Sequence, residues 1–244
     1  MKNKILTWSI AVALAGFLFG FDTIVISGAD QPIQKLWNTG PLFHGYFIMA
    51  MARWGTVIGA LFGGIPCDRW GRKKTLFWIG ILYLVSALGS ALAPEAYSFS
   101  FFRFIGGLGV GASSVAAPTY IAEISAPEKR GRLVALYQFN IVFGILIAFI
   151  SNYIVGEWVE NQAWRWMLGV EAIPATIYCI MILRVAESPR WLLTKRDDEP
   201  EARKVLSFMY PKDQIGDVVQ RIYVAAKSNV SKALFSGKFK FALW

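Results

Sequence analysis

The sequence Gly64-Ile-Pro-Cys-Asp-Arg-Trp-Gly-Arg-Lys-Lys74 decides how this chain folds. It places a dense basic cluster between two long apolar segments, Leu42–Pro66 and Thr75–Ala93. Charged side chains crowded together in this way cannot lie in hydrocarbon, because each would lose its hydration. The cluster therefore predicts a tight turn between two membrane-spanning helices, on the cytoplasmic side, where basic loops are retained.

The rest of the 244-residue chain repeats this alternation of apolar and polar segments. It is 55% hydrophobic with a mean hydropathy of +0.45, whereas soluble domains are about 45–50% apolar. The apolar residues fall in blocks of roughly 20, the length needed to cross a hydrocarbon core about 30 Å thick. We expect six spans: Leu6–Gly28, Leu42–Pro66, Thr75–Ala93, Phe99–Ala122, Leu133–Val155 and Trp164–Ala186.

The net charge of +9 indicates membrane topology rather than nucleic-acid binding. Most Lys and Arg outside the spans lie at the ends that share a side with the N-terminus. Only Lys35 and Arg165 lie at the opposite ends. Because basic loops stay inside, we expect an integral protein of the cell membrane with both termini in the cytoplasm. No nucleic-acid partner is expected.

The six spans divide into two units of three helices. Each unit crosses the bilayer an odd number of times, so the second must enter from the opposite side, as in the inverted repeats of many transporters. The expected fold is therefore an all-α membrane protein, with a 3+3 six-helix bundle over residues 1–190. Small residues recur at helical spacing and predict close helix contacts: Gly16 and Gly20, Gly55, Gly59 and Gly63, and Gly107 and Gly111.

Residues 191–244 have a different character and predict a cytoplasmic helical linker. Asp198 is typical of a helix start, and a second amphipathic helix is expected from Asp213. A short helix is expected around 231–235. None of these is apolar for long enough to span, and residues 240–244 look like the opening of a seventh span that this sequence does not contain.

Two charges inside the expected spans matter most. Asp22 on the first span and Arg103 on the fourth both lie roughly 6–9 Å below the outer membrane edge, so they can pair. A static bridge between helices is one interpretation. The other is a proton site, in which protonation of Asp22 releases Arg103 and is coupled to helix movement. Arg53, on the second span, has no obvious partner and is expected to snorkel.

Other kinds of chemistry have no sequence support. No metal-ligand cluster, nucleophile–base set or phosphate-cradling loop occurs in the pattern, so no enzyme activity, cofactor or metal is expected. Cys67 and Cys179 lie on different elements and are interpreted as packing residues rather than a disulfide.

Five motifs carry a resemblance to a known family. The run 64–74 resembles the loop between the second and third helices of the major facilitator superfamily. Four more segments are similar to its sugar porter family, bacterial proton–sugar symporters included: Gly20–Gly28, Arg103–Gly111, Glu123 with Arg130-Gly131, and Glu187–Leu192. Ala186 stands where the family normally has Pro. The resemblance covers essentially the whole chain but only the amino-terminal half of a member.

The resemblance implies half of a proton-coupled monosaccharide transporter. Members have twelve spans, and the sugar lies between two six-helix halves that alternate in access. Proton-coupled members carry Asp at the position of Asp22, which implies proton coupling through Asp22 and Arg103, whereas passive carriers have Asn. Gln138 and Phe19 match sugar contacts. Ile145 stands where xylose symporters have a second glutamine, so the sugar, hexose or pentose, stays open.

The resemblance also implies a cytoplasmic salt-bridge network, some of whose partners lie on a second half. Its members here are Asp68, Arg69, Arg72, Glu123, Arg130, Glu187 and Arg190. Three alternatives to energised import stay open: a facilitative carrier half, a truncated fragment that does not transport, and a membrane-embedded sugar sensor. Pairing with a separately encoded second half, or with another copy, would restore a complete transporter.

Overall fold

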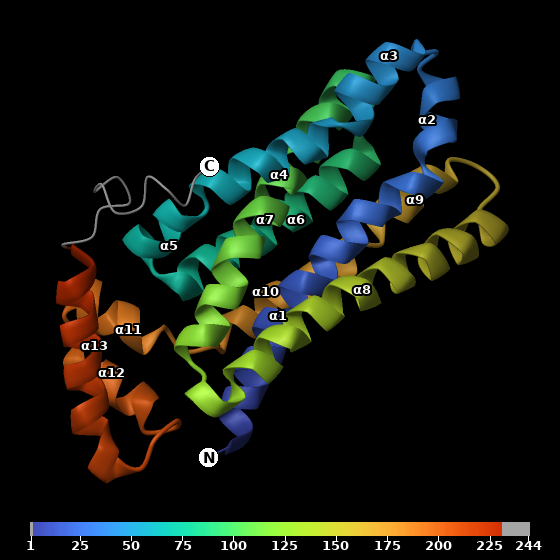
Figure 1. Cartoon of the computed structure of the whole chain (residues 1–244). Coiled ribbons are helices and arrows are strands. Elements are labelled where there is room, and N and C mark those ends of the chain that lie inside the picture. The colour runs from blue at the N-terminus through green and yellow to red at the C-terminus, as the bar shows by residue number, and fades with distance from the viewer. Residues whose placement is uncertain (1, 231–244) are drawn as a thin grey trace.

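The computed structural model describes residues 2–230, and every regular element in this part of the chain is helical (Figure 1). Six stretches are long and apolar enough to cross a membrane, by length and composition, which confirms the six predicted spans. They are Lys4–Gly28, Pro41–Phe62, Arg72–Leu92, Ala96–Glu123, Pro127–Trp158 and Ala163–Leu183. The helix expected at 231–235 and the opening of a seventh span lie outside the described residues.

The long elements form one elongated bundle (Figure 1). Spans one, three, four and five consist of α1 (Lys2–Val25, continued by the 3-10 turn Ile26–Gly28), α6 (Arg72–Leu92), α7 (Ala96–Glu123) and α8 (Pro127–Trp158). The second span combines α3 (Pro41–Phe43), a π-helical segment (His44–Met49) and α4 (Met51–Phe62). It ends earlier than predicted, because the chain bends at Gly63 into α5 (Gly64–Trp70), and α2 (Asp30–Leu36) joins it to α1.

The helix contacts follow a two-fold pattern. Span one (α1) packs along span five (α8), and span four (α7) packs along span two (α4). Spans one, two and three correspond to spans four, five and six. Under this correspondence the contact between spans one and five becomes the contact between spans four and two. The contact of α6 with α7 is matched in the same way by that of α10 (Ala172–Leu183) with α1. This symmetry is what a 3+3 inverted repeat requires.

Glycines make the two matching contacts possible. A Cβ atom at Gly20 would overlap the backbone carbonyl of Ile141, and one at Gly59 would overlap that of Leu108. The predicted small-residue stripes therefore lie in helix interfaces, where they let backbones approach closely.

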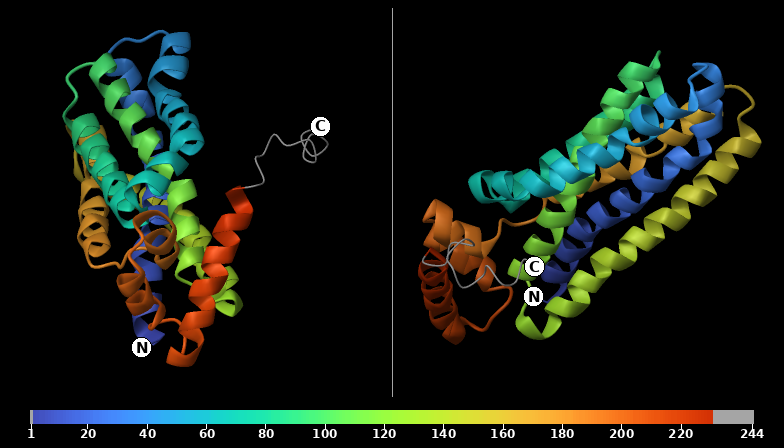
Figure 2. Two further views of the ribbon diagram at one scale, coloured as in Figure 1. Left: turned by 90° about the vertical axis from the view of Figure 1, so that its left-hand side faces the viewer. Right: turned by 45° about the horizontal axis from the view of Figure 1, so that its top comes forward.

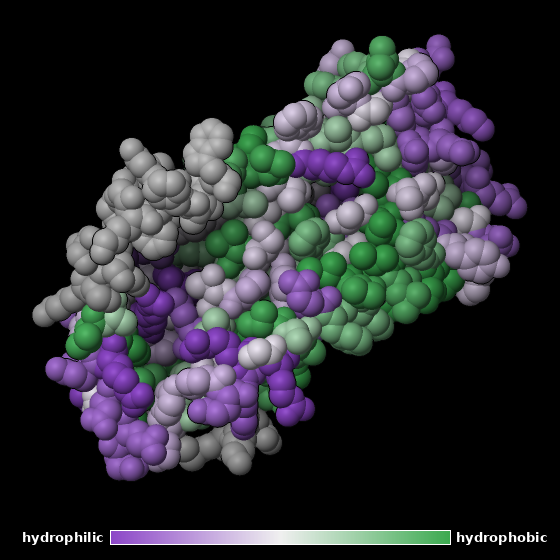
Figure 3. All heavy atoms as spheres, in the orientation of Figure 1, coloured by the Kyte–Doolittle hydropathy of each residue, from purple (hydrophilic) through white to green (hydrophobic). Residues whose placement is uncertain are grey.

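Two helices leave large apolar side chains uncovered. About one sixth of the apolar window is buried in spans two and five (17% in each), against 72% in span one. Figure 3 shows hydrophobic surface along the bundle. The exposed side chains include Trp54, Val57, Leu61 and Phe62 on α4 and Phe139, Val142, Leu146 and Phe149 on α8.

The sixth span is broken in its middle, where the sequence predicted one continuous span. Helix α9 (Ala163–Gly169) stops before Val170, and α10 begins at Ala172. Pro174 has no N–H to donate to the carbonyl of Val170, which instead accepts from Ile173 at 3.1 Å. The turn between α9 and α10 therefore carries Glu171 into the bundle interior.

Short helices gather at one end of the bundle, beside the N-terminus (Figure 2), and bury a second, smaller hydrophobic core. They are α11 (Pro189–Trp191), a π-helical turn (Leu192–Arg196), α12 (Glu199–Leu206) and α13 (Ile215–Val230). As predicted, Asp198 caps α12, accepting from the N–H of Glu201 at 3.2 Å. We call this end of the bundle the linker end and the opposite one the far end.

Candidate functional site

Asp22 of α1 and Arg103 of α7 meet in the bundle interior, where each side chain is 2% exposed. Arg103 Nη1 donates to Asp22 Oδ1 at 2.6 Å, and Nη2 donates to the backbone carbonyl of Asp22 at 3.0 Å. Arg103 Nε has no acceptor within the described structure. The two charges expected to pair therefore do so, with one guanidinium N–H group left over.

Glu171 is a third member of this cluster that the sequence analysis missed. It is fully buried at the break between α9 and α10, and in the described part of the chain neither carboxylate oxygen accepts a hydrogen bond from an N–H or O–H group of a neutral or basic residue. Its charge interacts with those of Asp22 and Arg103. The signal that could have revealed it is an acidic residue three positions before Pro174 in an otherwise apolar span.

The cluster is closed off by small and hydroxyl-bearing side chains. A Cβ atom at Gly106 would overlap Ser86 Oγ, so this glycine leaves room for the side chains of α6 and α1. Ser86 is fully buried, and its hydroxyl has no partner among residues 2–230. Buried polar groups without hydrogen-bond partners cost free energy.

The two residues matched to sugar contacts lie on adjoining helices but do not bond to each other. Phe19 of α1 is half-buried against the core, and Gln138 of α8 is exposed. No hydrogen bond to the Gln138 amide occurs within the described residues. One turn beyond Phe19, Thr23 is also exposed, and its hydroxyl donates to the Phe19 carbonyl at 2.8 Å. These side chains are open to a ligand or to a neighbouring protein surface.

At the linker end, Arg72 joins three elements. Its guanidinium donates twice to Glu123, from Nε to Oε2 at 2.9 Å and from Nη2 to Oε1 at 3.0 Å. Nη1 donates to Asp68 Oδ1 at 3.1 Å. Glu123 also accepts from Ser188 Oγ at 2.5 Å. The structure thus brings together three of the seven predicted network residues, and Arg72 with Glu123 forms a bidentate pair.

Glu187 caps a helix instead of forming a salt bridge. Its carboxylate accepts from the backbone N–H groups of Arg72 at 2.9 Å, Lys73 at 3.1 Å and Ser188 at 2.8 Å. It therefore lies at the N-terminus of α6, where the helix dipole favours a negative charge. In return, Lys73 Nζ donates to the Leu183 carbonyl at the end of α10, at 2.8 Å.

The other predicted network residues have no carboxylate within 4.0 Å in the described structure: Arg69, Arg130 and Arg190. Arg53 is exposed on α4, and its one hydrogen-bond acceptor among residues 2–230 is the Met49 carbonyl, at 3.4 Å. At the far end, buried His44 has a carboxylate partner, because its Nε2 lies 2.6 Å from Asp30 Oδ1.

Comparisons with known proteins agree on one family. The family model described as "Sugar (and other) transporter" matches residues 8–242. The D-xylose transporter of Levilactobacillus brevis is 43% identical over 203 residues, which are 83% of this chain and 44% of that protein. The glucose transport protein of Synechocystis sp. is 41% identical over 228 residues, which are 89% of this chain and 47% of that protein.

A solved structure gives the same answer for the fold. The proton:xylose symporter XylE, bound to 6-bromo-6-deoxy-D-glucose, superposes with a TM-score of 0.87 at 31% identity and covers 93% of this chain and 54% of its own. Bundle and buried cluster thus define a six-helix half of a major facilitator. The chain belongs to the sugar transporter family, whose members are membrane transporters rather than enzymes. It spans about half the length of the curated relatives it matches.

Proposed function

We propose that this chain is the amino-terminal half of a proton-coupled monosaccharide transporter that works by alternating access. Asp22 is the proton-accepting group, and Arg103 is its counter-ion. The observation that carries the proposal is the dry Asp22–Arg103 pair with Glu171 beside it. A second acid at the same site gives an arriving proton two carboxylates to share, with one cation between them.

The chemistry of the cluster supports coupling rather than a static bridge. A buried ion pair with all its lone pairs satisfied would hold the helices rigidly, whereas here, among the described residues, Glu171 accepts no hydrogen bond from an N–H or O–H group and Arg103 Nε donates none. Protonation of Asp22 weakens its hold on Arg103, whose freed N–H groups can then turn to Glu171. Because the three residues stand on α1, α7 and the broken sixth span, this exchange of partners moves helices.

The sugar is proposed to bind beside Phe19 and Gln138. An exposed amide and an aromatic face are groups that recognise hydroxyl-rich rings. The Gln138 amide has no hydrogen bond among the described residues, and Phe19 is only half-buried against the core. The remaining contacts are supplied by a second six-helix half. The uncovered apolar side chains of α4 and α8 support such a partner, since an interface of that kind is apolar at its core.

The linker end is proposed to face the cytoplasm. Arg69, Lys73, Arg130 and the other basic residues of that end support this orientation through the retention of positive loops. Both termini would then be cytoplasmic. The Arg72–Glu123 pair and the Glu187 cap would keep this side closed while the far end is open.

Reconstitution into proteoliposomes tests the proposal. The chain alone, and the chain co-expressed with the second half of the Levilactobacillus brevis relative, are assayed for labelled xylose and glucose uptake with and without an inward proton gradient. We expect gradient-dependent accumulation when the second half is present. Uptake that only equilibrates would identify a facilitative carrier, and no uptake in either arrangement would indicate a fragment that does not transport.

Asp22→Asn separates coupling from binding in the same assay. We expect loss of accumulation with retention of counterflow exchange, because Asn keeps the shape of the site but cannot carry a proton. Asp217→Asn, on an exposed position of α13, is the matched control and should behave as the wild type. Intact uphill uptake in Asp22→Asn would remove Asp22 from the mechanism.

A further inference from the structure

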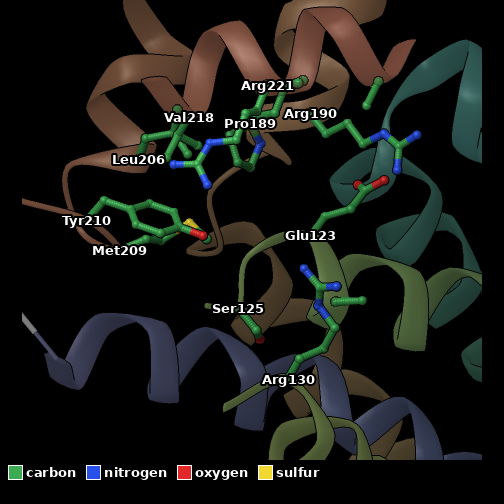
Figure 4. Close-up of a pocket in the computed structure, with 13 residues that line it drawn as sticks. Glu123, Ser125, Arg130, Pro189, Arg190, Leu206, Met209, Tyr210, Val218 and Arg221 are labelled. Atoms are coloured by element: carbon green, nitrogen blue, oxygen red, sulfur yellow. The ribbon is translucent and has the colours of Figure 1, made fainter. Parts of the chain in front are cut away.

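Arg53 lies in the middle of a span, unlike the arginines of the linker end. Arg130, Arg190 and Arg221, for example, border a hollow beside the short helices there (Figure 4). Arg53 instead stands in the second span, which runs from residue 41 to residue 62. At a rise of about 1.5 Å per residue, it is roughly 18 Å from one end of that span and roughly 14 Å from the other.

A guanidinium so far from both ends of a span is unfavourable next to lipid. Basic side chains can snorkel to the membrane surface near helix ends, but Arg53 lies too deep for the snorkelling expected from the sequence. Its side chain is exposed, and Nη1 is 3.4 Å from the Met49 carbonyl, beyond the usual length of an N–H···O hydrogen bond. Arginines in this situation face a water-filled path or a partner and mark the routes of substrates and ions.

Arg53 lies at the same depth as the proposed sugar contact Phe19. A Cβ atom at Gly107 of α7 would overlap the carbonyl of the residue just before Arg53, so Gly107 and Arg53 share one level. Gly107 is about one turn from Arg103 toward the linker end. Phe19 is about one turn from Asp22 in the same direction along α1. Because Asp22 and Arg103 are bonded to each other, Arg53 and Phe19 lie at one level of the bundle.

The side of α4 that carries Arg53 is turned toward α1. Thr56 and Ala60, three and seven residues after Arg53, share its side of the helix. Both contact α7 at Gly111, where an added Cβ atom would overlap the Thr56 carbonyl and the Ala60 nitrogen. Gly111 lies two turns after Arg103, on the stripe of α7 whose arginine reaches α1. Arg53 is therefore beside the surface of the bundle that α7 and α1 form together.

Gln138 approaches that surface from the other flank. Helices α4, α7, α1 and α8 pack side by side in this order (Figure 1). Residues 137–141 of α8 run along residues 16–20 of α1, where two glycines of α1 touch carbonyl groups of α8. Gln138 thus stands at the level of Phe19, and Arg53 stands at that level across α7. The exposed cation and the two proposed sugar contacts consequently lie at one depth of four adjacent helices.

We propose that the substrate is a carbohydrate that carries a carboxylate, such as a hexuronate, and that Arg53 binds the carboxylate. The planar guanidinium matches both carboxylate oxygens. The sugar ring would lie against Phe19 and Gln138, with its carboxylate toward α4. Because α4 and α1 both pack on α7, at interaxial distances of about 8–10 Å, one sugar acid and one arginine side chain can span the gap. The inference rests on the proposed function, whose substrate it specifies.

A neutral sugar would leave the charge of Arg53 uncompensated. The remaining source of a counter-charge is a carboxylate on the second six-helix half. In that case Arg53 would stabilise the contact between the halves and would not discriminate between substrates. The two possibilities therefore differ in one measurable property, which is the preference of the site for an acidic over a neutral sugar.

Equilibrium binding measures this preference without requiring transport. The chain is co-expressed with the second half of the Levilactobacillus brevis relative and purified into nanodiscs, and binding of labelled glucuronate and glucose is followed by scintillation proximity. We expect glucuronate to bind about tenfold more tightly than glucose, or better, because charge-assisted hydrogen bonds are added. Arg53→Gln should abolish the preference and leave the affinity for glucose within about twofold.

Two further variants make the result specific. Arg53→Lys keeps the charge but loses the planar pair of donors, so it should keep only part of the preference. Arg203→Gln removes the same charge from an exposed ion pair of α12 and should change neither affinity by more than about twofold. Glucose binding and thermal unfolding of each variant verify that the site and the bundle are intact.

Equal affinities for the two sugars in the wild type would overturn the inference, as would a preference that survives in Arg53→Gln. If glucose is still taken up in the reconstitution assay, the proposed function stands, and the partner of Arg53 is assigned to the second half. Glucuronate binding that depends on Arg53, without uptake of either sugar, would support the inference and contradict the proposed transport. Binding of neither sugar contradicts the inference whatever the uptake assays show.

Discussion

When a carboxylate and a guanidinium are buried together, the charge of each is stabilised by the charge of the other. In the Asp22–Arg103 pair both side chains are buried, so the loss of one leaves the other as a buried charge without a counter-ion. Polar groups in such a site determine which helices pair with each other, as well as how stable the pairing is. The pair is therefore tested through stability as well as through transport.

We expect Arg103→Met to lower the free energy of unfolding by about 3–5 kcal/mol, because Asp22 then stays buried without a cation. Adding Asp22→Leu should recover most of this loss, since two apolar side chains replace the pair. The measurement is chemical unfolding in detergent, with Arg203→Met at an exposed ion pair as control. A double variant no more stable than Arg103→Met would show that the pair itself holds the helices together.

Glu187 gives a prediction about pH. Burial raises the pKa of its carboxyl above the ordinary value of 4.5, although three backbone N–H groups and Arg72 oppose the rise. The folded state then holds this proton more tightly than the unfolded state does. Stability contributed by Glu187 is present below pH 4.5 and is lost as the pH rises through the folded-state pKa.

The Glu187→Gln variant should lack this component. Its unfolding midpoint, measured across the same pH range, should fall less on going upward from pH 4.5 than that of the wild type. Glu187→Ala should in addition lose about 1–3 kcal/mol, because buried N–H groups at the start of α6 lose their acceptor. Parallel pH profiles for the Glu187→Gln variant and the wild type would contradict the assigned titration.

At the scale of elements, backbone contact between α4 and α7 rests on glycine. Gly59→Ala should destabilise the bundle by about 1–3 kcal/mol, because the new methyl group overlaps the Leu108 carbonyl and the helices must separate. Gly64→Ala meets nothing within 4 Å and should be neutral or slightly stabilising. Thermal unfolding of both variants checks this contrast, and equal effects would show that close approach is unimportant.

The break in the sixth span has a simple cause that can be removed. Pro174→Ala restores an N–H for the Val170 carbonyl, so we expect α9 and α10 to join and amide hydrogen exchange over residues 170–175 to slow. Pro127→Ala, at the first turn of α8, is the control, since an N–H there has no helical acceptor in any case. Unchanged exchange would assign the break to packing around Glu171.

The elements also show what the sequence could predict. Apolar blocks of roughly 20 residues located all six spans, because hydrocarbon thickness sets their minimum length, and the largest error is the start of the fifth span, at Pro127 instead of Leu133. The same criterion could not reveal the break at Glu171, since one acidic residue barely changes the mean hydropathy of a window as long as a span. The role of Glu187 was equally hidden. It caps a helix that starts 115 residues earlier, and only the folded chain shows that contact.

At the scale of the whole molecule, charge and apolar surface are arranged along different directions. Basic residues concentrate at the linker end, whereas uncovered apolar side chains run along the length of α4 and α8. In the proposed function, the first arrangement would set the orientation of the bundle across the membrane, and the second would provide surfaces for lipid and for a second half. Asp22 and Arg103 could be paired from sequence alone because matched depth is a property of this long axis.

We predict that the linker end faces the cytoplasm, and the two native cysteines do not interfere with a labelling test of this orientation. Cys67 is buried, which raises the pKa of its thiol to about 11, and Cys179 is also buried, so neither should react with a maleimide. Single cysteines are introduced at Lys195, at the linker end, and at Asn161, at the far end, both of them exposed. In intact cells, a membrane-impermeant maleimide should label only Asn161→Cys, and permeabilisation should add Lys195→Cys. The reverse pattern would place the basic linker end outside the cell and would overturn the proposed topology.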